Sequence, residues 1–292
     1  MDVSVIIVNY NTCQMTAECI DSIFKRTIGL KFEVILVDNA STDGSKEYFA
    51  KDGRINYIYS NNNIGFGRAN NLGYNKSSGK YVFCLNSDTL LLNNALKIFF
   101  DKMESLPKTV GCIGCMLLNH QELEIGTSYG KHLDLRGLFI MKTNVTKYNK
   151  EYHNNRCWNG EKPEYFKVGY VTGADMFIRR EVISQFGLFD EDFFMYYEDT
   201  EMSWRYESHG FENGIIRGPR IIHYHGLSSS GRRTLKQSIL REINHSKSEK
   251  LYFKKTGSYA RYIAANCIIT INEFYLILYM SLRTLLKTII KH

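Results

Sequence analysis

Proline is scarce in this sequence, with three residues in 292, so no Pro-rich linker divides the chain. A Gly-x-Gly-x-x-Gly motif does not follow the first apolar segment, and a Gly-x4-Gly-Lys-Ser/Thr motif is absent. These absences disfavour dinucleotide dehydrogenases and P-loop proteins. The composition, 44% hydrophobic and 23% charged, is otherwise that of a globular protein and excludes disordered and collagen-like classes.

Cysteine forms no framework either, because the seven cysteines are scattered along the chain. The close pair Cys112 and Cys115 has no second pair to complete a zinc site, and it lies in an apolar run. We therefore expect both residues to be buried thiols. The sequence opens on a strand pattern at residues 1–5 without a cationic stretch, which predicts a reducing, cytoplasmic location.

Acidic residues are scarce in one part of the chain only. Residues 226–292 contain 12 Lys and Arg against 3 Asp and Glu, a net charge of +9, whereas residues 1–225 have a net charge of −2. The formal total of +7 therefore belongs to the C-terminal tail. A basic tail beside a nearly neutral body disfavours nucleic acid as the partner and favours an anionic lipid surface.

The tail also lacks a long uninterrupted apolar run, because Asn266, Asn272 and Glu273 interrupt the apolar residues 262–282. A spanning helix needs about 20 predominantly apolar residues, and a carboxylate near its middle costs a few kcal/mol in hydrocarbon. Residues 232–243 are basic and are expected to be helical. We therefore expect helices that lie at a membrane interface or pack on protein, rather than a span.

Strand-like and helical segments alternate through the first 120 residues. The strand-like runs, such as Val-Ser-Val-Ile-Ile-Val, are continuously apolar, as in strands that are buried on both faces. Strands separated by helices predict a parallel sheet with right-handed crossovers. We expect strands at residues 3–8, 32–37, 55–59 and 81–85, and helices at residues 12–26, 46–49, 67–76 and 93–103.

Short polar residues follow each of these four strands. The carboxyl ends of parallel strands meet at one edge of a sheet, where ligands bind. Asn and Asp are also common turn formers, but four coincidences at one edge favour a site. Asp38 suits the ribose or base of a nucleotide, and Asp88, on a tight turn, suits Mg²⁺ or Mn²⁺. The four segments are Asn9-Tyr10-Asn11, Asp38-Asn39, Asn61-Asn62-Asn63 and Asn86-Ser87-Asp88.

The second half of the chain is less regular, and residues 120–167 yield no predicted elements. Beyond them we expect strands at 167–172, 175–179, 214–216 and 220–223, and helices at 180–186 and 200–209. Glu198 and Asp199 lie among aromatic residues, which raise the pKa of a carboxyl group and suit a general base, although acids also favour the first turn of a helix. His223 and His225 end a strand on the same side, where either could bind a metal.

Taken in order, six segments resemble family 2 glycosyltransferases of the GT-A fold, especially bacterial rhamnosyltransferase-like enzymes of O-antigen and capsular polysaccharide assembly. Each segment alone is unspecific, but the ordered set, which spans residues 3–228, is highly specific. The segments are VSVIIVNYN (3–11), VILVDNASTDGS (34–45), NNNIGFGRANNLGY (61–74), YVFCLNSDT (81–89), VTGADMFIRREVISQFGLFDEDFFMYYEDTEMSWR (171–205) and HYHGLS (223–228).

The resemblance implies an α/β architecture, the GT-A fold, with a mostly parallel sheet flanked by helices. Residues 1–228 would form this domain, with a nucleotide-binding half at 1–119 and an acceptor and catalytic half at 120–228. Residues 229–292 would form a basic amphipathic helical tail. The implied reaction is an inverting, metal-dependent transfer from a nucleotide-sugar, dTDP-L-rhamnose or a UDP-hexose, to a hydroxyl group of a lipid-linked surface glycan.

The resemblance also implies roles for single residues. Asp88 matches the last acid of the metal-binding D-x-D motif, and Asn86 stands in its first position, so Asp88 would make most of the metal contact. His223, or His225 in its place, would be a further ligand of Mg²⁺ or Mn²⁺. Asp199, in Glu198-Asp199, resembles the catalytic base. The expected nucleotide-binding residues are Asp38 and its neighbours Asn9, Asn39 and Gly65.

The expected partners are a nucleotide-sugar donor, a lipid-linked or oligosaccharide acceptor, and the inner face of a bacterial plasma membrane, contacted peripherally by the tail. The oligomeric state stays open. One alternative is a sugar nucleotidyltransferase, which would carry a Gly-rich basic loop where this chain has Asn9-Tyr10-Asn11. A non-catalytic nucleotide-sugar-binding module is disfavoured, because the acid, metal and base positions are all present.

Overall fold

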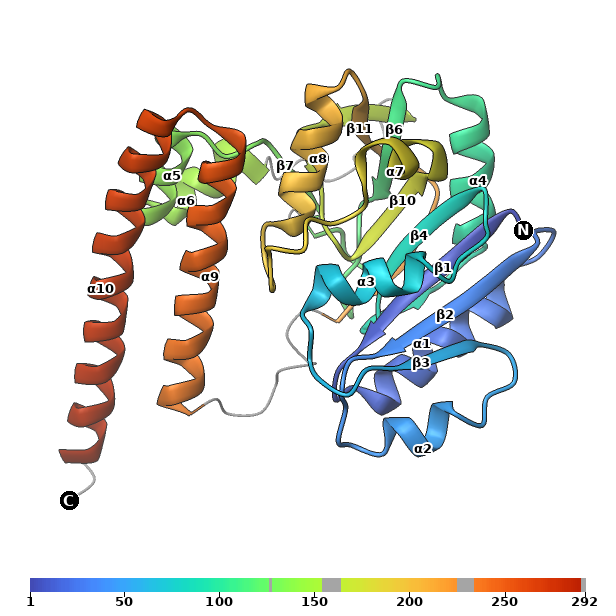
Figure 1. Ribbon diagram of the computed structural model, residues 1–292, viewed down its shortest axis with the longest axis horizontal. Coiled ribbons are helices and arrows are strands. Elements are labelled where there is room, and N and C mark those ends of the chain that lie inside the picture. The colour runs from blue at the N-terminus through green and yellow to red at the C-terminus, as the bar shows by residue number, and fades with distance from the viewer. Residues whose placement is uncertain (126–127, 154–163, 225–233, 290–292) are drawn as a thin grey trace.

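The computed structural model describes residues 1–125, 128–153, 164–224 and 234–289. Its centre is an eight-stranded sheet with the order β3-β2-β1-β4-β10-β6-β11-β8 (Figure 1). Two pairs of short strands, β5 with β12 and β7 with β9, lie outside it. The strands are β1 (Val3–Asn9), β2 (Phe32–Asp38), β3 (Asn56–Tyr59), β4 (Tyr81–Asn86), β5 (Thr89–Leu91), β6 (Val110–Cys115), β7 (Tyr129–Gly130), β8 (Tyr165–Val168), β9 (Tyr170–Val171), β10 (Asp175–Arg179), β11 (Glu212–Ile216) and β12 (Ile221–His223).

The first four strands are parallel, which confirms the prediction from their apolar runs. Helices α1 (Cys13–Arg26), α2 (Ser45–Phe49), α3 (Phe66–Tyr74) and α4 (Ala95–Ser105) follow these strands. Alternate residues of β1 face opposite sides: Val5 and Ile7 pack with α1 and α4, whereas Ile6 packs with α3. The strands are therefore apolar throughout because helices cover both faces of the sheet.

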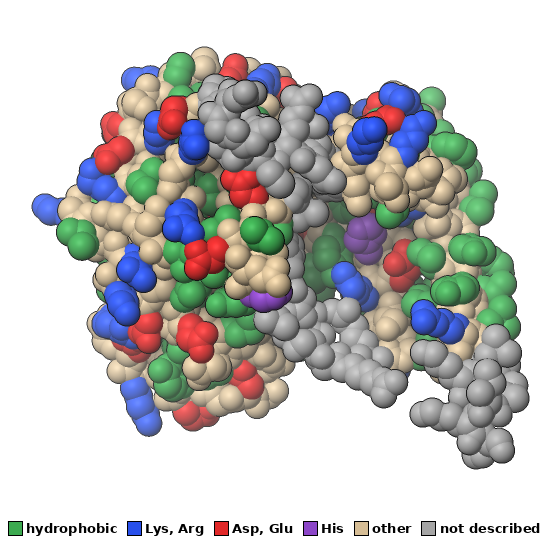
Figure 2. All heavy atoms as spheres, turned by 180° about the vertical axis from the view of Figure 1, so that it is seen from behind, with side chains coloured by type: hydrophobic (Ala, Val, Ile, Leu, Met, Phe, Trp, Pro, Cys, Tyr) green, Lys and Arg blue, Asp and Glu red, His purple; other side chains and the backbone are tan. Residues whose placement is uncertain are grey.

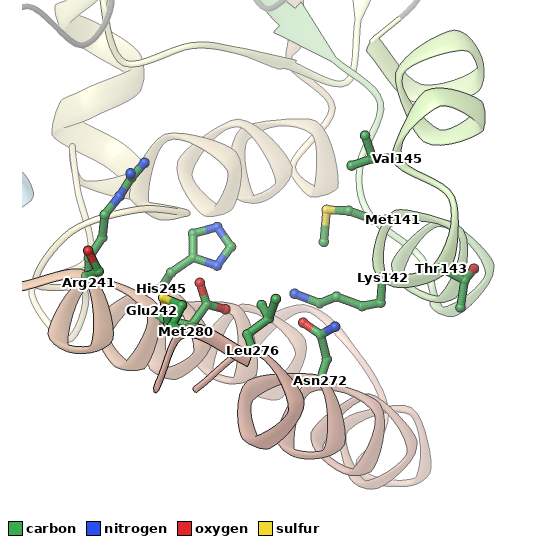
Figure 3. A pocket seen from close by; sticks show the side chains of 11 residues that line it. Met141, Lys142, Thr143, Val145, Arg241, Glu242, His245, Asn272, Leu276 and Met280 are labelled. Carbon is green, nitrogen blue, oxygen red and sulfur yellow. The ribbon is translucent and has the colours of Figure 1, made fainter. Parts of the chain in front are cut away.

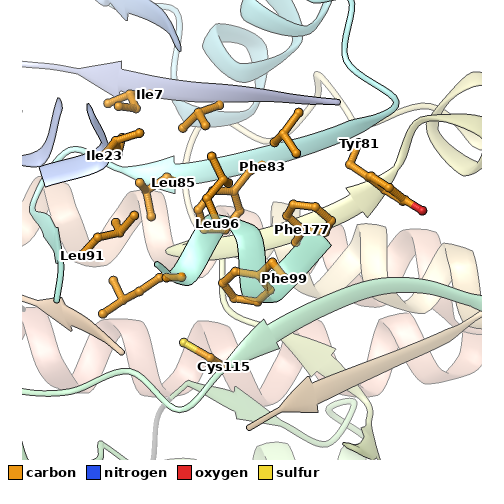
Figure 4. Packing of buried hydrophobic residues seen from close by; sticks show 14 of the residues in the cluster. Ile7, Ile23, Tyr81, Phe83, Leu85, Leu91, Leu96, Phe99, Cys115 and Phe177 are labelled. Carbon is orange, nitrogen blue, oxygen red and sulfur yellow. The ribbon is translucent and has the colours of Figure 1, made fainter. Parts of the chain in front are cut away.

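Aromatic rings fill the core between the sheet and α4 (Figure 4). The ring centroid of Phe99 lies 5.1 Å from that of Phe83 on β4 and 5.5 Å from that of Phe177 on β10. All three side chains are fully buried. This contact joins the parallel half of the sheet to the second half of the chain.

Strand β10 lies between β4 and β6 and is antiparallel to both. Asp175 is opposite Leu85, so the start of β10 lies at the carboxyl end of β4. Helices α7 (Arg180–Phe186) and α8 (Glu198–Ser208) follow β10 and pack with α3 on the same face of the sheet. The strand predicted at 167–172 is wrong as one element, because Gly169 separates β8, which pairs with β11, from β9, which pairs with β7 in another sheet. The other predicted elements of this half are present, with bounds that differ by a few residues.

The close cysteine pair is buried, as the sequence predicts. Cys112 and Cys115 lie on β6 with no exposed surface. Burial raises the pKa of both thiols well above the usual value, so they are packing residues. Cys157 lies outside the described residues.

Part of the segment without predicted elements belongs to the C-terminal hairpin. Helices α5 (Leu135–Thr143) and α6 (Val145–Tyr148) and a π-helical turn at Asn149–His153 lie beside α9 (Leu235–Thr256) and α10 (Tyr259–Ile289) (Figure 1). The hairpin therefore has a hydrophobic core of its own, apart from the two clusters on the sheet. That core consists of Leu133, Leu138, Ile140, Tyr148, Tyr152, Phe193, Tyr252, Phe253, Ala265 and Ile269.

Helix α10 is apolar over a long stretch. Residues Tyr259–Thr284 have a mean hydropathy of 1.5 in their most apolar window, of which 11% is buried, so by length and composition this helix could cross a membrane. Ala265 and Ile269 on its inner side are fully buried in the hairpin core. Figure 2 shows hydrophobic side chains along its outer side. One face of α10 is thus packed on protein, and the other is exposed.

Candidate active site

The polar ends of β1 and β2 lie side by side at the carboxyl edge of the sheet. Asn9 pairs with Asp38 in the strand register, and both side chains are fully buried. The Asp38 carboxylate accepts hydrogen bonds from the Ser41 backbone N–H (2.9 Å) and the Tyr57 hydroxyl (2.8 Å). The Asn9 amide donates to Ser41 Oγ (3.1 Å) and accepts from Thr12 Oγ1 (2.8 Å). In this conformation both side chains fix the two loops that frame the edge.

Asn39 organises the loop that leads into α3. Its side chain donates to Asn63 Oδ1 (3.0 Å) and accepts from the Ile64 backbone N–H (2.9 Å). Gly65, which precedes α3, has a φ of +90°, and a Cβ atom there would lie 2.3 Å from the carbonyl oxygen of Phe194. This position therefore requires glycine. The loop is held against the chain around Phe194, which also accepts a hydrogen bond from the Phe66 backbone N–H (3.0 Å).

Asp88 and His223 meet because β5 pairs with β12, with Thr89 opposite His223. Asp88 Oδ1 lies 3.2 Å from His223 Nε2, and Asn86 Nδ2 lies 3.3 Å from the same nitrogen. The Asp88 and His223 side chains are both buried. A carboxylate oxygen and an imidazole nitrogen that converge in this way are suitable ligands for Mn²⁺ or Mg²⁺.

The pair needs further ligands to complete such a site. Among the described residues, no group of three or more His, Cys, Asp and Glu side chains could hold a metal ion. Water and donor phosphates commonly supply the remaining oxygens around Mg²⁺. The side chains of Asp88 and His223 therefore fit a cation that is also bound by the phosphates of a substrate. His225, the alternative ligand, lies outside the described residues.

Glu198 and Asp199 open helix α8. Burial raises the pKa of both carboxyl groups, and the charge of Asp199 raises that of Glu198 further. Asp199 accepts hydrogen bonds from the backbone N–H groups of Gly173 (2.8 Å) and Thr200 (2.7 Å), which offset part of this rise. Glu198 Oε2 is buried and has no hydrogen-bond partner within the described part of the chain. Asp199 is therefore the member of the pair that ionises more readily.

The two residues before this pair have unusual backbone conformations. Tyr196 and Tyr197 have φ values of +72° and +67°. Large side chains rarely occupy this left-handed region, and such residues gather at functional sites, where their surroundings hold them in place. Their conformation turns the chain sharply into α8.

Asp199 and Glu198 line a cavity of about 290 Å³. Its other walls include Lys131, Tyr148 and Tyr170 from the middle of the chain, and His245 from α9. The sequence predicts no site in either of these two segments. The sequence carries no local signal for these residues, because they neither follow a predicted strand nor form a motif. His245 lies at this cavity because α9 packs against α8.

Backbone contacts connect the base-like pair to the carboxylate–imidazole pair. Gly173, whose N–H binds Asp199, precedes Ala174, whose carbonyl oxygen accepts the backbone N–H of Asn86 (3.0 Å). Asn86 in turn contacts His223. Every predicted site residue from the parallel strands thus lies along one edge of the sheet, with Asp199 and His223 brought to it by β10 and β12.

The sequence at residues 126–130 has the Gly-x-Ser-x-Gly form, but its Ser128 does not have the geometry of a nucleophile. Ser128 is fully buried, its hydroxyl donates to the Ile125 carbonyl oxygen (2.9 Å), and its oxygen accepts the Leu117 backbone N–H (2.9 Å). An α/β-hydrolase nucleophile would be exposed at the end of a strand. Ser128 is therefore a structural residue.

Comparison with known proteins identifies relatives of this chain. A family model described as Glycosyl transferase family 2 matches residues 4–187. Glycosyltransferase GlyG of Streptococcus pneumoniae is 30% identical over 106 residues, which is 35% of this chain and 35% of GlyG, so the match spans about a third of that relative. The low-salt glycan biosynthesis hexosyltransferase Agl10 of Haloferax volcanii is 26% identical over 227 residues, 76% of this chain and 67% of Agl10.

A further relative is the N-acetylglucosaminyl-diphospho-decaprenol L-rhamnosyltransferase of Mycobacterium tuberculosis, 25% identical over 223 residues, which is 68% of each chain. Two solved structures share the fold. The mannosyltransferase PcManGT from Pyrobaculum calidifontis, in complex with GDP-Man and Mn²⁺, has a TM-score of 0.57 and 16% identity, and covers 96% of this chain and 72% of its own. GalNAc-T7 with UDP, GalNAc and Mn²⁺ has a TM-score of 0.60 and 17% identity, and covers 87% and 50%.

Asp175, beside the Gly173–Asp199 contact, supplies a test of the buried charge at this edge. Burial raises its pKa to about 8, and the hydrogen bond from the Cys115 backbone N–H offsets only part of the rise. Because the folded-state pKa is raised, the protonated carboxyl group stabilises the fold below the usual Asp pKa of about 4, and this stability is lost as the pH rises toward about 8.

We therefore expect Asp175→Asn, which is neutral at every pH, to gain thermal stability relative to wild type between about pH 5 and pH 8. Melting curves of both proteins at these two pH values measure the difference. Asp101→Asn, on the exposed side of α4, controls for the loss of one carboxylate. A stability difference that is the same at both pH values would contradict the buried, raised-pKa assignment.

Proposed function

The chain belongs to glycosyl transferase family 2, and from this premise we propose an inverting, metal-dependent transfer of a sugar from a nucleotide-sugar to a hydroxyl group of a growing lipid-linked surface glycan of the O-antigen or capsule type. One observation carries the proposal beyond the family. Asp199 lines a cavity and accepts hydrogen bonds from two backbone N–H groups, one of which belongs to Gly173. The next residue, Ala174, accepts the backbone N–H of Asn86, which contacts His223 beside Asp88.

The donor would bind across the ends of β1 and β2. Asp38, Asn39 and Gly65 frame this edge, and Asn9 holds the two loops together beneath it. The M. tuberculosis relative is named as an L-rhamnosyltransferase, which agrees with a rhamnose donor, and the Haloferax relative is named as a hexosyltransferase, which agrees with a hexose donor. The donors that we propose are dTDP-L-rhamnose and a UDP-hexose. We place dTDP-L-rhamnose first, because the resemblance to rhamnosyltransferase-like enzymes spans both halves of the domain.

Asp88 and His223 would hold Mg²⁺ or Mn²⁺ together with the donor phosphates. Two structural neighbours contain Mn²⁺ with a nucleotide or nucleotide-sugar, which supports this proposal. When bound, the cation would act as a Lewis acid for the charge on the departing nucleoside diphosphate. Asn86 Nδ2 contacts His223 Nε2 at 3.3 Å, which helps to place the ring beside Asp88.

Asp199 would be the general base. Its carboxylate takes the proton of the acceptor hydroxyl while that oxygen forms a bond to the anomeric carbon. The bond from this carbon to the phosphate oxygen breaks on the opposite face, and its electron pair leaves with the nucleoside diphosphate. One displacement inverts the anomeric centre. Glu198, whose raised pKa favours the neutral form, adds little negative charge beside the base.

The acceptor would approach through a second cavity of about 740 Å³ between α5, α9 and α10 (Figure 3). Met141 and His245 line both this cavity and the one at Asp199. Figure 3 shows Lys142 and His245 reaching into it from different helices. The lining combines the charged Lys142, Arg241 and Glu242 with the apolar Leu276 and Met280, and cationic groups beside apolar ones suit a sugar that is joined through phosphate to a lipid.

Membrane contact would come from the exposed face of α10. One side of the helix is packed in the hairpin core, which favours a helix that lies on the inner face of the membrane over one that spans it. The basic tail adds electrostatic attraction to anionic lipids. The exposed apolar residues of this face are Tyr259, Ile263, Ile271, Phe274, Tyr275, Leu278, Tyr279 and Leu282.

Replacement of the base tests the reaction. We expect Asp199→Asn to lower transfer by roughly 10²–10⁴-fold while donor affinity survives, because the general base is lost but the donor contacts remain. Glu198→Gln, which mimics the protonated neighbour, should lose far less. Turnover and calorimetric donor binding measure the two effects. Near-normal turnover in Asp199→Asn would remove this residue from the base role.

Removal of the cation tests the Asp88–His223 assignment. EDTA should suppress transfer, and Mg²⁺ or Mn²⁺ should restore it, because the departing diphosphate needs a counter-charge. Asp88→Asn should raise the concentration of Mn²⁺ that restores activity, since one carboxylate ligand becomes an amide. Full activity in the chelator would contradict a metal-dependent reaction.

Charged substitutions on α10 test the membrane contact. Ile271 and Phe274 are 72% and 70% exposed. We expect Ile271→Glu with Phe274→Glu to abolish sedimentation with phosphatidylglycerol vesicles, because carboxylates oppose burial in the lipid and repel its headgroups. Ile28→Glu with Leu123→Glu, two exposed apolar positions on the sheet domain, is the matched control. Unchanged sedimentation of the α10 variant would refute the contact.

A further inference from the structure

The loop that leads into the base-like pair is held by one face of α9. Lys255 Nζ forms ion pairs with Asp190 and Asp192, each at 2.7 Å, and Ser248 Oγ donates to the Met195 carbonyl oxygen (2.7 Å). The residues of α9 that contact this loop are Arg241, His245, Ser248, Glu249 and Lys255. Their spacing places them along one side of the helix, so α9 contacts residues 190–197 at several points.

Two of these contacts reach the tyrosines with left-handed backbones. The His245 ring lies 5.3 Å from the Tyr196 ring and 5.4 Å from the Tyr197 ring. Arg241 Nε donates to the Tyr196 hydroxyl (3.2 Å), and the Tyr197 hydroxyl donates to Glu249 Oε1 (2.9 Å). A strained backbone persists only where its surroundings hold it. Here the surroundings are the side chains of α9.

Glu249 is the buried anchor of this arrangement. Its side chain has no exposed surface, and Lys142 of α5 pairs with its second oxygen at 2.8 Å. The Tyr197 hydroxyl and the Lys142 ammonium group thus satisfy one oxygen each. A buried carboxylate with both partners in place fixes geometry closely, because loss of Lys142 would leave an uncompensated charge and loss of the Tyr197 hydroxyl would leave a buried oxygen without a hydrogen bond.

The opposite side of the loop rests on the donor edge. The Phe66 backbone N–H donates to the Phe194 carbonyl oxygen (3.0 Å), and Arg68 Nε donates to the Glu191 carbonyl oxygen (2.7 Å). The backbones are in direct contact here, because a Cβ atom at Gly65 would lie 2.3 Å from the Phe194 carbonyl oxygen. Residues 190–197 therefore lie between α3, at the donor side, and α9, in the tail.

We propose that α9 is a positioning element of the catalytic centre, and that Lys255 and Glu249, the latter through Tyr197, hold residues 190–197 so that Asp199 meets the acceptor hydroxyl. This inference rests on the proposed role of Asp199. The tail then contributes to the reaction by positioning Asp199, in addition to contacting the membrane. A loosened loop leaves the donor contacts of the parallel strands intact but displaces the base.

A pair of lysines on α9 provides a matched test. Lys255 binds the loop, whereas Lys250 pairs with Glu273 of α10 at 3.0 Å, and the two side chains are similarly exposed at 27% and 23%. Lys255→Gln and Lys250→Gln remove one ion-pairing lysine each from the same helix. Tyr197→Phe removes only the hydroxyl group that binds Glu249.

The first readout is hydrogen–deuterium exchange of the full chain without substrate. The Gly173 backbone N–H donates to Asp199, so its exchange reports the position of the base directly. We expect faster exchange at Gly173 and in the first turn of α8 for Lys255→Gln and Tyr197→Phe, with no matching increase at the amides of β1 and β4, which separates local loosening from a loss of global stability. Lys250→Gln should match wild type at these amides.

The second readout is hydrolysis of dTDP-L-rhamnose or UDP-glucose, whichever wild type turns over. A misplacement of about 1 Å can cost a hundredfold in rate, so we expect Tyr197→Phe to lower kcat by roughly ten- to a hundredfold and Lys255→Gln by less, with KM for the donor unchanged.

Wild-type exchange at Gly173 in both loop variants, or equal effects of Lys250→Gln and Lys255→Gln, would overturn the positioning role. An active Asp199→Asn variant would instead overturn the base assignment, and the exchange data would still report on the α9 contact. The two failures are therefore distinguishable.

Discussion

The antiparallel pairing of β10 with β4 and β6 is the constraint on which the candidate site depends. Because β10 runs against its neighbours, its first residues reach the edge where the parallel strands end. Gly173 and Ala174 then offer an N–H to Asp199 and a carbonyl oxygen to Asn86. A parallel strand here would place its carboxyl end at this edge and these groups at the opposite edge.

The distribution of hydrogen bonds at this edge separates the two carboxyl groups that open α8. Glu198 is buried and Asp199 is half-buried, and both have a raised pKa. Backbone N–H groups stabilise the charged form of Asp199, whereas Glu198 Oε2 has no such partner in the described chain. The same local sequence, Glu-Asp, therefore supplies one group suited to accept a proton and one suited to stay neutral.

The C-terminal tail is more closely joined to the rest of the protein than its charge suggests. It shares a hydrophobic core with residues 133–153, and α9 contacts the loop that precedes Asp199. The outer face of α10 stays exposed and apolar. The exposed apolar face of α10 and part of the wall of the cavity at Asp199 therefore belong to one helical unit.

Most of the sheet domain could be predicted from the sequence, because its signals are local. The apolar runs of β1, β2 and β4, the helical spacing of α1 and the polar residues after each strand identify a parallel sheet with a site at its edge. The buried Cys112 and Cys115 followed from their apolar run. The resemblance of six segments added the family, which the comparisons confirm.

What the sequence by itself determined was thus the identity of the elements and of the edge residues, since periodicity and turn chemistry act within a few residues. Only the tertiary structure decided which distant groups meet there. His223 reaches Asp88 through the pairing of β5 with β12, and Glu249 reaches Tyr197 through the packing of α9 on α8. Such contacts depend on strand partners and helix packing, and a hydrophobic pattern specifies which face of an element is buried but not what buries it.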